Sequence, residues 1–289
     1  MGTFKTQPIE RVKNITKEEF IEHYYKPQKP VLIEGLIKDW PAYEKWNLDY
    51  IKDLAGDQEV PLYNNQVTKG KQKSAEPAMT MLMSEYIDII KTQPTDLRIF
   101  FFDVMKKMPQ LANDFKFPDI GLKFFKRLPV MFFGSKGSNV LVHYDMDLAD
   151  LIHVHFHGKK SVLLFSPEQT KYMYKVPYSV HNLEDIDMDN PDFEKYPALQ
   201  KLEAIEVEMN HGDTLYMPSS YWHYIKYLNG GFSITLRAFS KKPSIALRML
   251  YNVFFMRHFE NVMRKLRGQK WIDYKNRLAI KRTHKALKK

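Results

Sequence analysis

The sequence contains no cysteine among its 289 residues. This absence excludes a disulfide framework, a thiolate zinc site, a cysteine nucleophile and a cysteine-ligated iron–sulfur cluster. A bound metal would need His, Asp or Glu ligands, and the chain has 10 His and 34 acidic residues. A chain without cysteine also fits a reducing compartment, so we expect a cytoplasmic protein.

Long apolar runs are missing as well. No stretch approaches the length of about 18 consecutive apolar residues that a membrane-spanning helix needs. Residues 1–14 lack the apolar segment of a secretory signal. We therefore expect no membrane partner. Hydrophobic residues still make up 44% of the chain, which is enough for a large core and argues against disorder.

Most of the chain also lacks a net charge. Eleven of the 44 Lys and Arg residues and one of the 34 acidic residues lie in residues 262–289, so this segment carries the whole net charge of +10. A basic tail of this kind could bind RNA or an acidic partner. A solvated helical face with no partner is the alternative interpretation.

The predicted secondary structure changes twice along the chain, from helical to β-rich and back to helical. Thr16 and Glu19 have the spacing of a capping box, and helices are predicted after them, at 48–54 and at 81–90. The middle segment is rich in short β-type runs, which predict a sandwich or a barrel. The predicted strands are 99–102, 130–133, 140–145, 151–157, 161–165, 205–208, 214–217, 222–227 and 232–239. Helical periodicity returns after Pro243, so we predict a catalytic unit over residues 1–242 and a basic helical extension over residues 243–289.

His143 and Asp145 stand two residues apart in a predicted strand, so their side chains should project to the same face. An imidazole beside a carboxylate forms two corners of a facial metal triad. One further His completes such a triad and leaves three positions open, which suits non-haem Fe(II). His223 is the candidate, because it follows a Gly-Asp turn, an apolar strand and Pro218. A hydrogen-bonded polar pair without a metal is the alternative interpretation.

Five pieces of sequence, in one order, carry a family resemblance. They are residues 29–33 with 39–41, 143–145, 158–167, 189–197 and 212–223. On these pieces, residues 9–239 resemble the JmjC/cupin-like (cupin_8) oxygenases that depend on Fe(II) and 2-oxoglutarate. That group includes the asparaginyl hydroxylase of hypoxia-inducible factor and the tRNA wybutosine hydroxylase. The resemblance implies a mainly β fold, a double-stranded β-helix or jelly-roll (cupin) barrel with helical flanks at both ends.

The resemblance also implies roles for individual residues. The catalytic metal ligands, which would hold Fe(II), are His143, Asp145 and His223. Lys160 matches the lysine that binds the distal carboxylate of 2-oxoglutarate. An ammonium group inside a barrel is costly unless an anion meets it, so the physical chemistry agrees with this role. Lys159 is expected to point to the opposite face, outward.

The match to the family is incomplete around the cosubstrate. Arg237 stands where an Asn is usual, Asn139 lies near the position of a usual hydroxyl residue, and residues 99–102 lack the usual Tyr. We expect Asn139 and Arg237 to join Lys160 in binding 2-oxoglutarate. For Arg237, contact with an acidic group of the substrate and a plain salt bridge are the alternatives.

Three histidines, His153, His155 and His157, alternate along one predicted strand and should face one side. A second metal site and an ordinary surface strand are both consistent with this spacing. We favour His153 and His155 as hydrogen-bonding residues of the pocket wall, because alignment backwards from Lys160 puts His155 where relatives carry an inward Gln.

The resemblance implies an enzyme, a dioxygenase that hydroxylates a protein side chain or an RNA nucleoside. Demethylation would use the same chemistry. The alternatives are a catalytically inactive cupin-fold module that binds nucleic acid or an acidic partner, and a metal-binding cupin of another activity. Relatives that pair through C-terminal helices also imply a homodimer; the alternative is that these helices pack on their own barrel.

Overall fold

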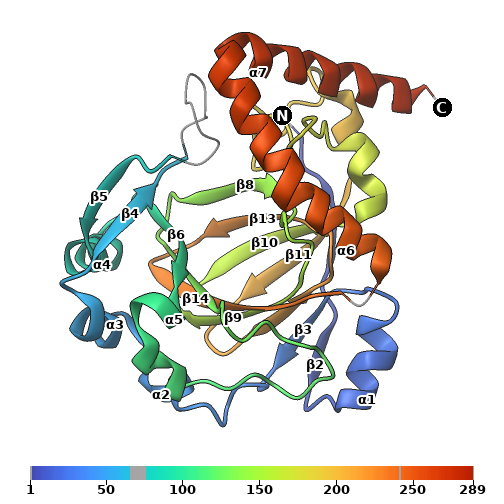
Figure 1. The fold of residues 1–289 in the computed structure, drawn as a ribbon. Helices are drawn as coiled ribbons and strands as arrows, with labels where there is room; N and C mark the ends of the chain where they lie inside the picture. Colours follow the sequence, from blue (N-terminus) through green and yellow to red (C-terminus); the bar gives the residue numbers. More distant parts are fainter. Residues whose placement is uncertain (1, 66–75, 241, 289) are drawn as a thin grey trace.

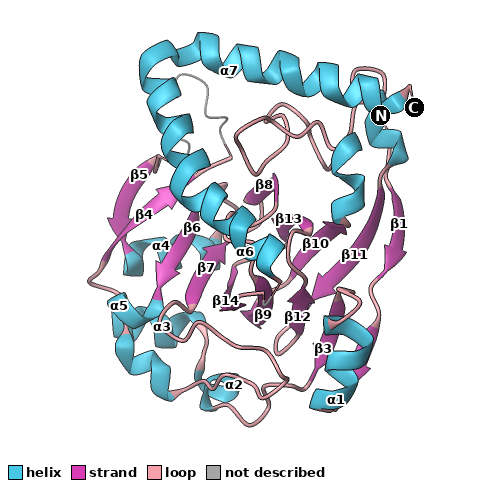
Figure 2. Ribbon diagram, turned by 45° about the vertical axis from the view of Figure 1, so that its right-hand side comes forward, coloured by secondary structure: helices cyan, strands magenta, loops and turns pink. Residues whose placement is uncertain are grey.

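The computed structural model describes residues 2–65, 76–240 and 242–288. Its strands form two sheets that enclose a barrel (Figures 1 and 2). The five-stranded sheet has the order β1 (Lys5–Pro8), β11 (Glu203–Met209), β10 (Lys160–Phe165), β13 (Trp222–Tyr227) and β8 (Asn139–His143). The nine-stranded sheet has the order β2 (Arg11–Lys13), β3 (Val31–Glu34), β12 (Thr214–Met217), β9 (Asp150–His157), β14 (Gly231–Ala238), β7 (Val130–Gly134), β6 (Arg98–Asp103), β4 (Glu59–Tyr63) and β5 (Met79–Leu82). The predicted jelly-roll (cupin) fold is confirmed.

Alternating residues of the strands fill the space between the sheets. An apolar cluster there includes Leu151 of β9, Val162 and Leu164 of β10, and Leu215 of β12. Because side chains alternate along a strand, the polar residues of the same parity in β9 and β10 also point inward. The barrel interior therefore continues from an apolar part into a polar part.

Helices of the N-terminal flank cover the outer face of the nine-stranded sheet and bury the largest apolar cluster against it. They are α1 (Lys17–Phe20), η1 (Ile21–Tyr25), α2 (Pro41–Lys45), α3 (Leu48–Ala55) and α4 (Met83–Thr92). The predicted capping box is present: the Glu19 amide donates to Thr16 Oγ1 at 3.2 Å, and the Thr16 amide donates to Glu19 Oε2 at 2.9 Å. This flank fixes the wall of the barrel from outside. Two further short helices, α5 (Val104–Lys107) and η2 (Pro109–Asn113), follow β6.

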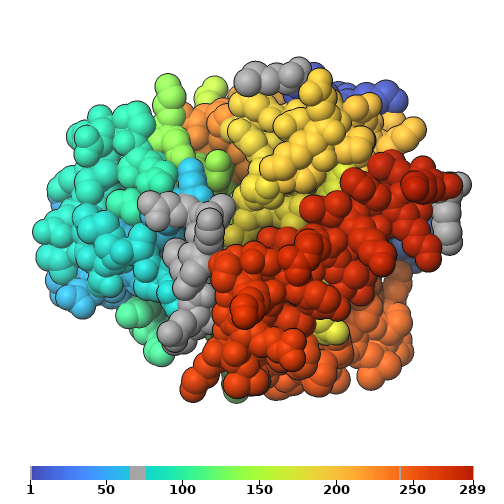
Figure 3. Space-filling model, turned by 90° about the horizontal axis from the view of Figure 1, so that it is seen from above, coloured from blue at the N-terminus to red at the C-terminus, as the bar shows by residue number. Residues whose placement is uncertain are grey.

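The C-terminal segment is a bent helical arm. It comprises α6 (Pro243–Leu250), η5 (Tyr251–Met256) and α7 (Arg257–Leu287), and Gly268 interrupts α7 with φ 49° and ψ −131°. We call residues 243–267 the first arm and residues 269–287 the second arm; Figure 2 shows the bend between them. The second arm packs through Ala279 onto a cluster outside the five-stranded sheet, beside the segment drawn in yellow in Figure 3. Within the described residues, no helix is long and apolar enough to cross a membrane.

The strands predicted between residues 99 and 239 are all present, with ends that differ by one or two residues. Strands β1, β2 and β5 were not predicted; they are short and their residues are largely exposed. Strand β4 was also not predicted; it is short, contains Pro61 and buries only Val60 and Leu62. The helix predicted from Met81 is wrong at its start: residues Met79–Leu82 form β5, and the helix begins at Met83. The long polar segment after β10 contains two 3-10 turns, η3 (Pro167–Tyr172) and η4 (Pro197–Lys201).

Candidate metal centre

The three predicted metal ligands come together at one end of the barrel interior. His143 ends β8 and His223 lies opposite it in the antiparallel partner β13. Oδ1 of Asp145 is 3.6 Å from Nε2 of His143 and 3.8 Å from Nε2 of His223. The strand was predicted to include Asp145 but ends at His143, and the turn that follows still directs this carboxylate toward the histidines. All three ligand atoms lie within 4.8 Å of one another.

Backbone carbonyls hold the other nitrogen of each histidine. Nδ1 of His143 is 2.7 Å from the carbonyl of Leu141, and Nδ1 of His223 is 3.2 Å from the carbonyl of Tyr221. An imidazole that donates through Nδ1 keeps the Nε2 lone pair for a metal. Burial and the neighbouring His143 lower the pKa of His223 to about 4, so this ring is neutral at pH 7. Burial would raise the pKa of Asp145, but the adjacent guanidinium and the two imidazoles outweigh it and hold the carboxyl well below its usual range.

Two imidazole nitrogens and one carboxylate oxygen form the donor set of a facial triad, which fits Fe(II) and leaves cis positions for other ligands. Among residues 2–65, 76–240 and 242–288, this is the one group of three or more His, Asp or Glu side chains arranged to hold a metal ion. The His-Asp-His triad expected from the sequence is therefore present, and the second metal site considered for the histidine strand is not seen in this part of the chain.

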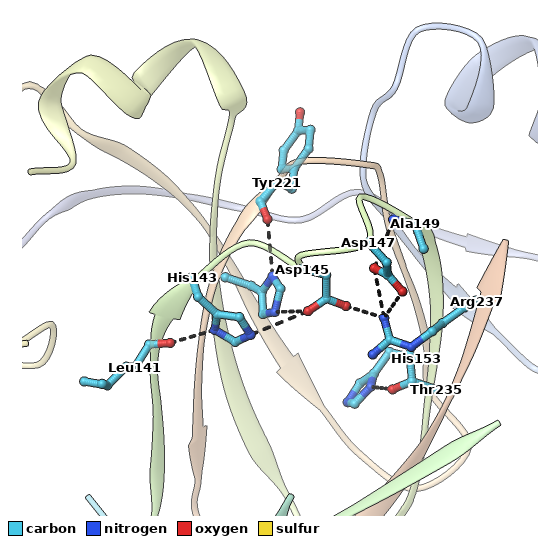
Figure 4. Close-up of polar contacts among 10 residues, drawn as sticks. Leu141, His143, Asp145, Asp147, Ala149, His153, Tyr221, Thr235 and Arg237 are labelled. Atoms are coloured by element: carbon cyan, nitrogen blue, oxygen red, sulfur yellow. Dashed lines mark hydrogen bonds and ion pairs between the residues drawn. The ribbon is translucent and has the colours of Figure 1, made fainter. Parts of the chain in front are cut away.

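The second oxygen of Asp145 faces a buried arginine. Nη1 of Arg237, in β14, donates to Asp145 Oδ2 at 2.6 Å and to Asp147 Oδ2 at 3.1 Å. Figure 4 shows Asp145 between His143 and Arg237. The salt bridge considered from the sequence is therefore present. Contact between Arg237 and 2-oxoglutarate stays a prediction.

Lys160 opens β10 and is 0% exposed. Its Nζ lies 2.6 Å from Nε2 of His153, donates to the hydroxyl of Ser233, and stands 5.2 Å from the ring centre of Tyr227. Burial lowers the pKa of Lys160 well below its ordinary value. No carboxylate pairs with this amine in the described parts of the chain, whereas its neighbour Lys159 is exposed, as predicted. A buried amine without an anion points to an anionic ligand.

The histidine strand forms one wall of the polar interior. His153 Nδ1 lies 2.7 Å from Thr235 Oγ1, and His155 Nδ1 lies 2.8 Å from Ser233 Oγ. Burial lowers the pKa of both histidines well below the usual value, so both are neutral hydrogen-bonding groups. Nε2 of His155 is buried without a partner. His157, at the end of β9, is only half-buried.

Asn139 lies at the start of β8, away from the triad. Its amide donates to Asn65 Oδ1 at 3.1 Å, and its side chain bonds to Tyr224, which belongs to the apolar cluster outside the five-stranded sheet. The predicted contact between Asn139 and 2-oxoglutarate has no support in this geometry. Thr235 and Ser233 were not singled out from the sequence, although their period of two with Arg237 along β14 would have indicated the same inward face.

Comparison with known proteins agrees with the fold. The model of a family described as a cupin-like domain matches residues 16–261, which is most of the chain. The chain belongs to the cupin-like domain family. Membership of this cupin-like family and the triad together support an oxygenase of the Fe(II) and 2-oxoglutarate type, which is the coarser form of the prediction made above.

Several curated proteins are similar to this cupin-like chain. Lysine-specific demethylase 8 of Xenopus tropicalis is 28% identical over 227 residues, which cover 75% of this chain and 50% of that protein. The tRNA wybutosine-synthesizing protein 5 of Homo sapiens is 28% identical over 241 residues, 75% of this chain and 73% of that protein. Lysine-specific demethylase JMJ30 of Arabidopsis thaliana is 29% identical over 241 residues, which cover 78% of this chain and 54% of that protein. The chain thus spans about half the length of these two demethylases.

Proposed function

We propose that this protein is an Fe(II)- and 2-oxoglutarate-dependent dioxygenase that hydroxylates a protein side chain or an RNA nucleoside. The observation that carries the proposal is Lys160, a fully buried amine that pairs with no carboxylate of the described residues, in the same barrel as the His-Asp-His triad. The triad would hold Fe(II), and Lys160 would bind the distal carboxylate of 2-oxoglutarate. Bound iron would supply the oxidative chemistry that couples O₂ to the cosubstrate and the substrate.

The charges inside the barrel favour this pair of ligands. Asp145 and Asp147 are matched by Arg237 and by Lys160 in its protonated form. A divalent metal would then need two further negative charges, and a 2-oxo dicarboxylate supplies both. Because uncompensated charge is costly in a buried site, the complete set of metal and dicarboxylate is more favourable than either ligand alone.

Aromatic rings near Arg237 are the candidates for holding the substrate. The guanidinium carbon of Arg237 lies 5.6 Å from the ring centre of Phe101, and Phe100 lies 5.9 Å from Phe101. Both rings are exposed, so a substrate can reach them on the side of Arg237 where Phe101 lies. In this proposal they orient the group to be oxidised and keep bulk water from it.

Production of succinate tests the reaction. Purified protein loaded with Fe(II) is incubated with 2-oxoglutarate and with fractions of cellular protein or RNA, and succinate is measured. Mass spectrometry then identifies products that gain one oxygen atom only when 2-oxoglutarate is present. Absence of iron-dependent succinate with every fraction would favour the inactive binding module. A lost methyl group instead of a gained oxygen would favour demethylation.

We also propose that the protein is a homodimer through the first arm. Half of the exposed large apolar residues of the described chain lie on this arm and the start of the next. They are Leu247, Leu250, Tyr251, Phe254, Phe255, Val262, Leu266 and Tyr274. On the first arm they recur at intervals of three, four and seven residues, which makes an apolar stripe on one helical face. Such a stripe is unusual unless a second surface covers it.

Introducing a charge into this stripe is expected to produce monomers. Leu247 and Phe254 are 68% and 67% exposed, so Leu247→Glu and Phe254→Glu should leave the fold unchanged. Light scattering of the full chain is expected to give twice the mass of one chain for the wild type. Each variant is expected to give the mass of one chain, and both results should hold in low and in high salt. Leu228→Glu changes an exposed apolar residue outside the arm and is the control. A monomeric wild type at micromolar concentration would exclude the dimer.

The basic second arm is proposed to bind single-stranded RNA at the bend of α7. A groove of about 780 Å³ there is lined by Met263, Leu266, Arg267, Lys270, Trp271, Tyr274 and Arg277. The cations Arg267, Lys270 and Arg277 form no ion pair with described residues. Cations beside the accessible ring of Tyr274 suit a phosphate backbone with stacked bases. An acidic protein would use the cations but has less use for the aromatic ring.

Salt dependence tests this RNA site. Binding of a labelled single-stranded RNA is measured by fluorescence anisotropy over a range of salt concentrations, with an acidic peptide as competitor. Replacing both Arg267 and Lys270 by Ala is expected to reduce the slope of log affinity against log salt by about 2. Lys281→Ala with Lys285→Ala removes two exposed cations outside the groove and is the control. Equal slopes for wild type and the groove variant would contradict the proposal, and tighter binding of the peptide would favour an acidic protein.

A further inference from the structure

The two carboxylate oxygens of Asp145 have different surroundings. Oδ1 lies 3.6 Å from Nε2 of His143 and 3.8 Å from Nε2 of His223, where a metal would be held. Oδ2 points the other way and accepts a hydrogen bond of 2.6 Å from Nη1 of Arg237 (Figure 4). The guanidinium therefore hydrogen-bonds to Oδ2, the oxygen of Asp145 that faces away from the two histidines.

Arg237 is itself held in one place. Asp147 accepts from the same Nη1 at 3.1 Å through Oδ2 and at 3.4 Å through Oδ1. The ring of Phe101 lies against the guanidinium, with its centre 5.6 Å from Cζ. Phe101 reaches this position because β6 has a register shift against β7 between Ile99 and Phe102, and Phe101 takes a positive φ of 62° there. A side chain that is almost fully buried and held on two sides cannot easily leave Asp145.

We infer that Arg237 is a positioning residue that restricts Asp145 to coordination through a single oxygen, with Asp147 and Phe101 keeping the guanidinium in place. The inference rests on the proposed function only in requiring a metal between His143, Asp145 and His223. A carboxylate that is free to rotate can bind a metal through both oxygens. The second oxygen would then take one of the cis positions that a facial triad must leave open for its other ligands.

Asp147 gives the arrangement a second purpose. Without Arg237, the carboxylates of Asp145 and Asp147 would stand close together in a partly buried site, and no other Lys or Arg of the described residues forms an ion pair with either of them. Asp147 would then be a competing ligand for any metal bound nearby. Arg237 therefore keeps one oxygen of Asp145 and the carboxylate of Asp147 away from the metal, through charge-assisted hydrogen bonds of the stronger kind.

Cobalt(II) substitution tests the inference without turnover. The full-length protein is titrated with Co²⁺ alone, and the visible absorption spectrum reports the number and type of ligands. Arg237→Met is expected to change this spectrum, because oxygens of Asp145 or Asp147 add to the metal. Arg237→Lys is expected to return part of the wild-type spectrum, since an ammonium group can still donate to Oδ2 of Asp145. With Co²⁺ bound, Arg237→Met should also weaken 2-oxoglutarate binding at least about ten-fold, a loss of about 1.4 kcal/mol.

Arg264→Met is the matched control. Arg264 is as buried as Arg237 and bonds to Glu260 at 2.6 Å on the first arm, outside the barrel. Its removal should lower thermal stability and leave the cobalt spectrum unchanged. A spectrum of Arg237→Met that superimposes on the wild type would overturn the inference while the metal site stands. If Arg237→Met does not fold, Arg237→Gln takes its place, because a neutral and shorter side chain cannot keep the charge-assisted contact to Oδ2 of Asp145. A wild-type cobalt spectrum for that variant would overturn the inference. A wild-type protein that binds no Co²⁺ would overturn the proposed function itself, and the inference with it.

Discussion

Replacing His223 by Ala is expected to abolish Fe(II)-dependent formation of succinate from 2-oxoglutarate while the protein stays folded. The change leaves His143 and Asp145 as the remaining metal ligands. A facial triad needs three protein ligands, so the variant should bind Fe(II) more weakly. Changes to residues that merely orient metal ligands typically cost about 10–100-fold in metal affinity or activity. Loss of a ligand should therefore cost at least about 100-fold, measured as succinate produced at saturating 2-oxoglutarate.

The control separates loss of the ligand from loss of the fold. His258 is an exposed histidine of the first arm, so His258→Ala removes the same side chain far from any metal ligand. Its succinate production should equal that of the wild type. His223→Ala should keep the wild-type circular dichroism spectrum but bind less iron at equilibrium. Full turnover by His223→Ala would show that the triad is wrongly assigned.

Lys160→Met is expected to raise the apparent constant for 2-oxoglutarate about ten- to a hundred-fold. A hydrogen bond to a charged group contributes about 1.5–3 kcal/mol, and each 1.4 kcal/mol is a factor of about ten. Met is unbranched and only one atom shorter than lysine, so the apolar stem is kept and the barrel should remain nearly filled. Burial lowers the pKa of Lys160 in the free protein, and a bound carboxylate raises it again. Binding of 2-oxoglutarate should therefore be accompanied by proton uptake, and affinity should fall as the pH is raised.

Two comparisons make this prediction specific. Lys159→Met removes the exposed neighbouring lysine and should leave the constant unchanged. Calorimetry in buffers of different ionisation enthalpy measures the proton uptake, which Lys160→Met should remove. If Lys160→Met keeps both the wild-type constant and the proton uptake, the distal carboxylate is bound elsewhere, and Arg237 is the next residue to test.

The sequence predicts those parts of the site that depend on local periodicity. Lys160 faces inward because it shares the parity of Val162 and Leu164 in its strand, and this pattern is visible in the sequence. For His153 and His155 the alternation predicts only a shared face, and the resemblance to a family supplied the inward direction. Local periodicity could not predict that the triad assembles, because 78 positions separate Asp145 and His223. Resemblance to a family supplied that pairing, and the antiparallel register of β13 and β8 accounts for it physically.

The contacts of Arg237 could not be predicted in the same way. They depend on the turn after His143, which directs Asp145 and Asp147 toward β14, and on the register shift that places Phe101. Neither a turn direction nor a β-bulge follows from a pattern of apolar residues, because both are set by how strands from distant parts of the chain align. Asn139 illustrates the converse: its position beside the motif suggested a role, but its side chain bonds to Tyr224 on the other face of the sheet.

The bend in the C-terminal arm also escaped prediction, because the apolar pattern of α7 continues through Gly268. A Cβ at Gly268 would have no heavy atom within 4 Å, so only the backbone conformation, φ 49° and ψ −131°, demands glycine there. Any other residue would favour one straight rod of roughly 65 Å over residues 243–287. In such a straight helix the second arm would no longer contact the cluster outside the five-stranded sheet. A single glycine thus decides whether the outer cluster around Ala279 stays covered and whether the basic groove exists at all.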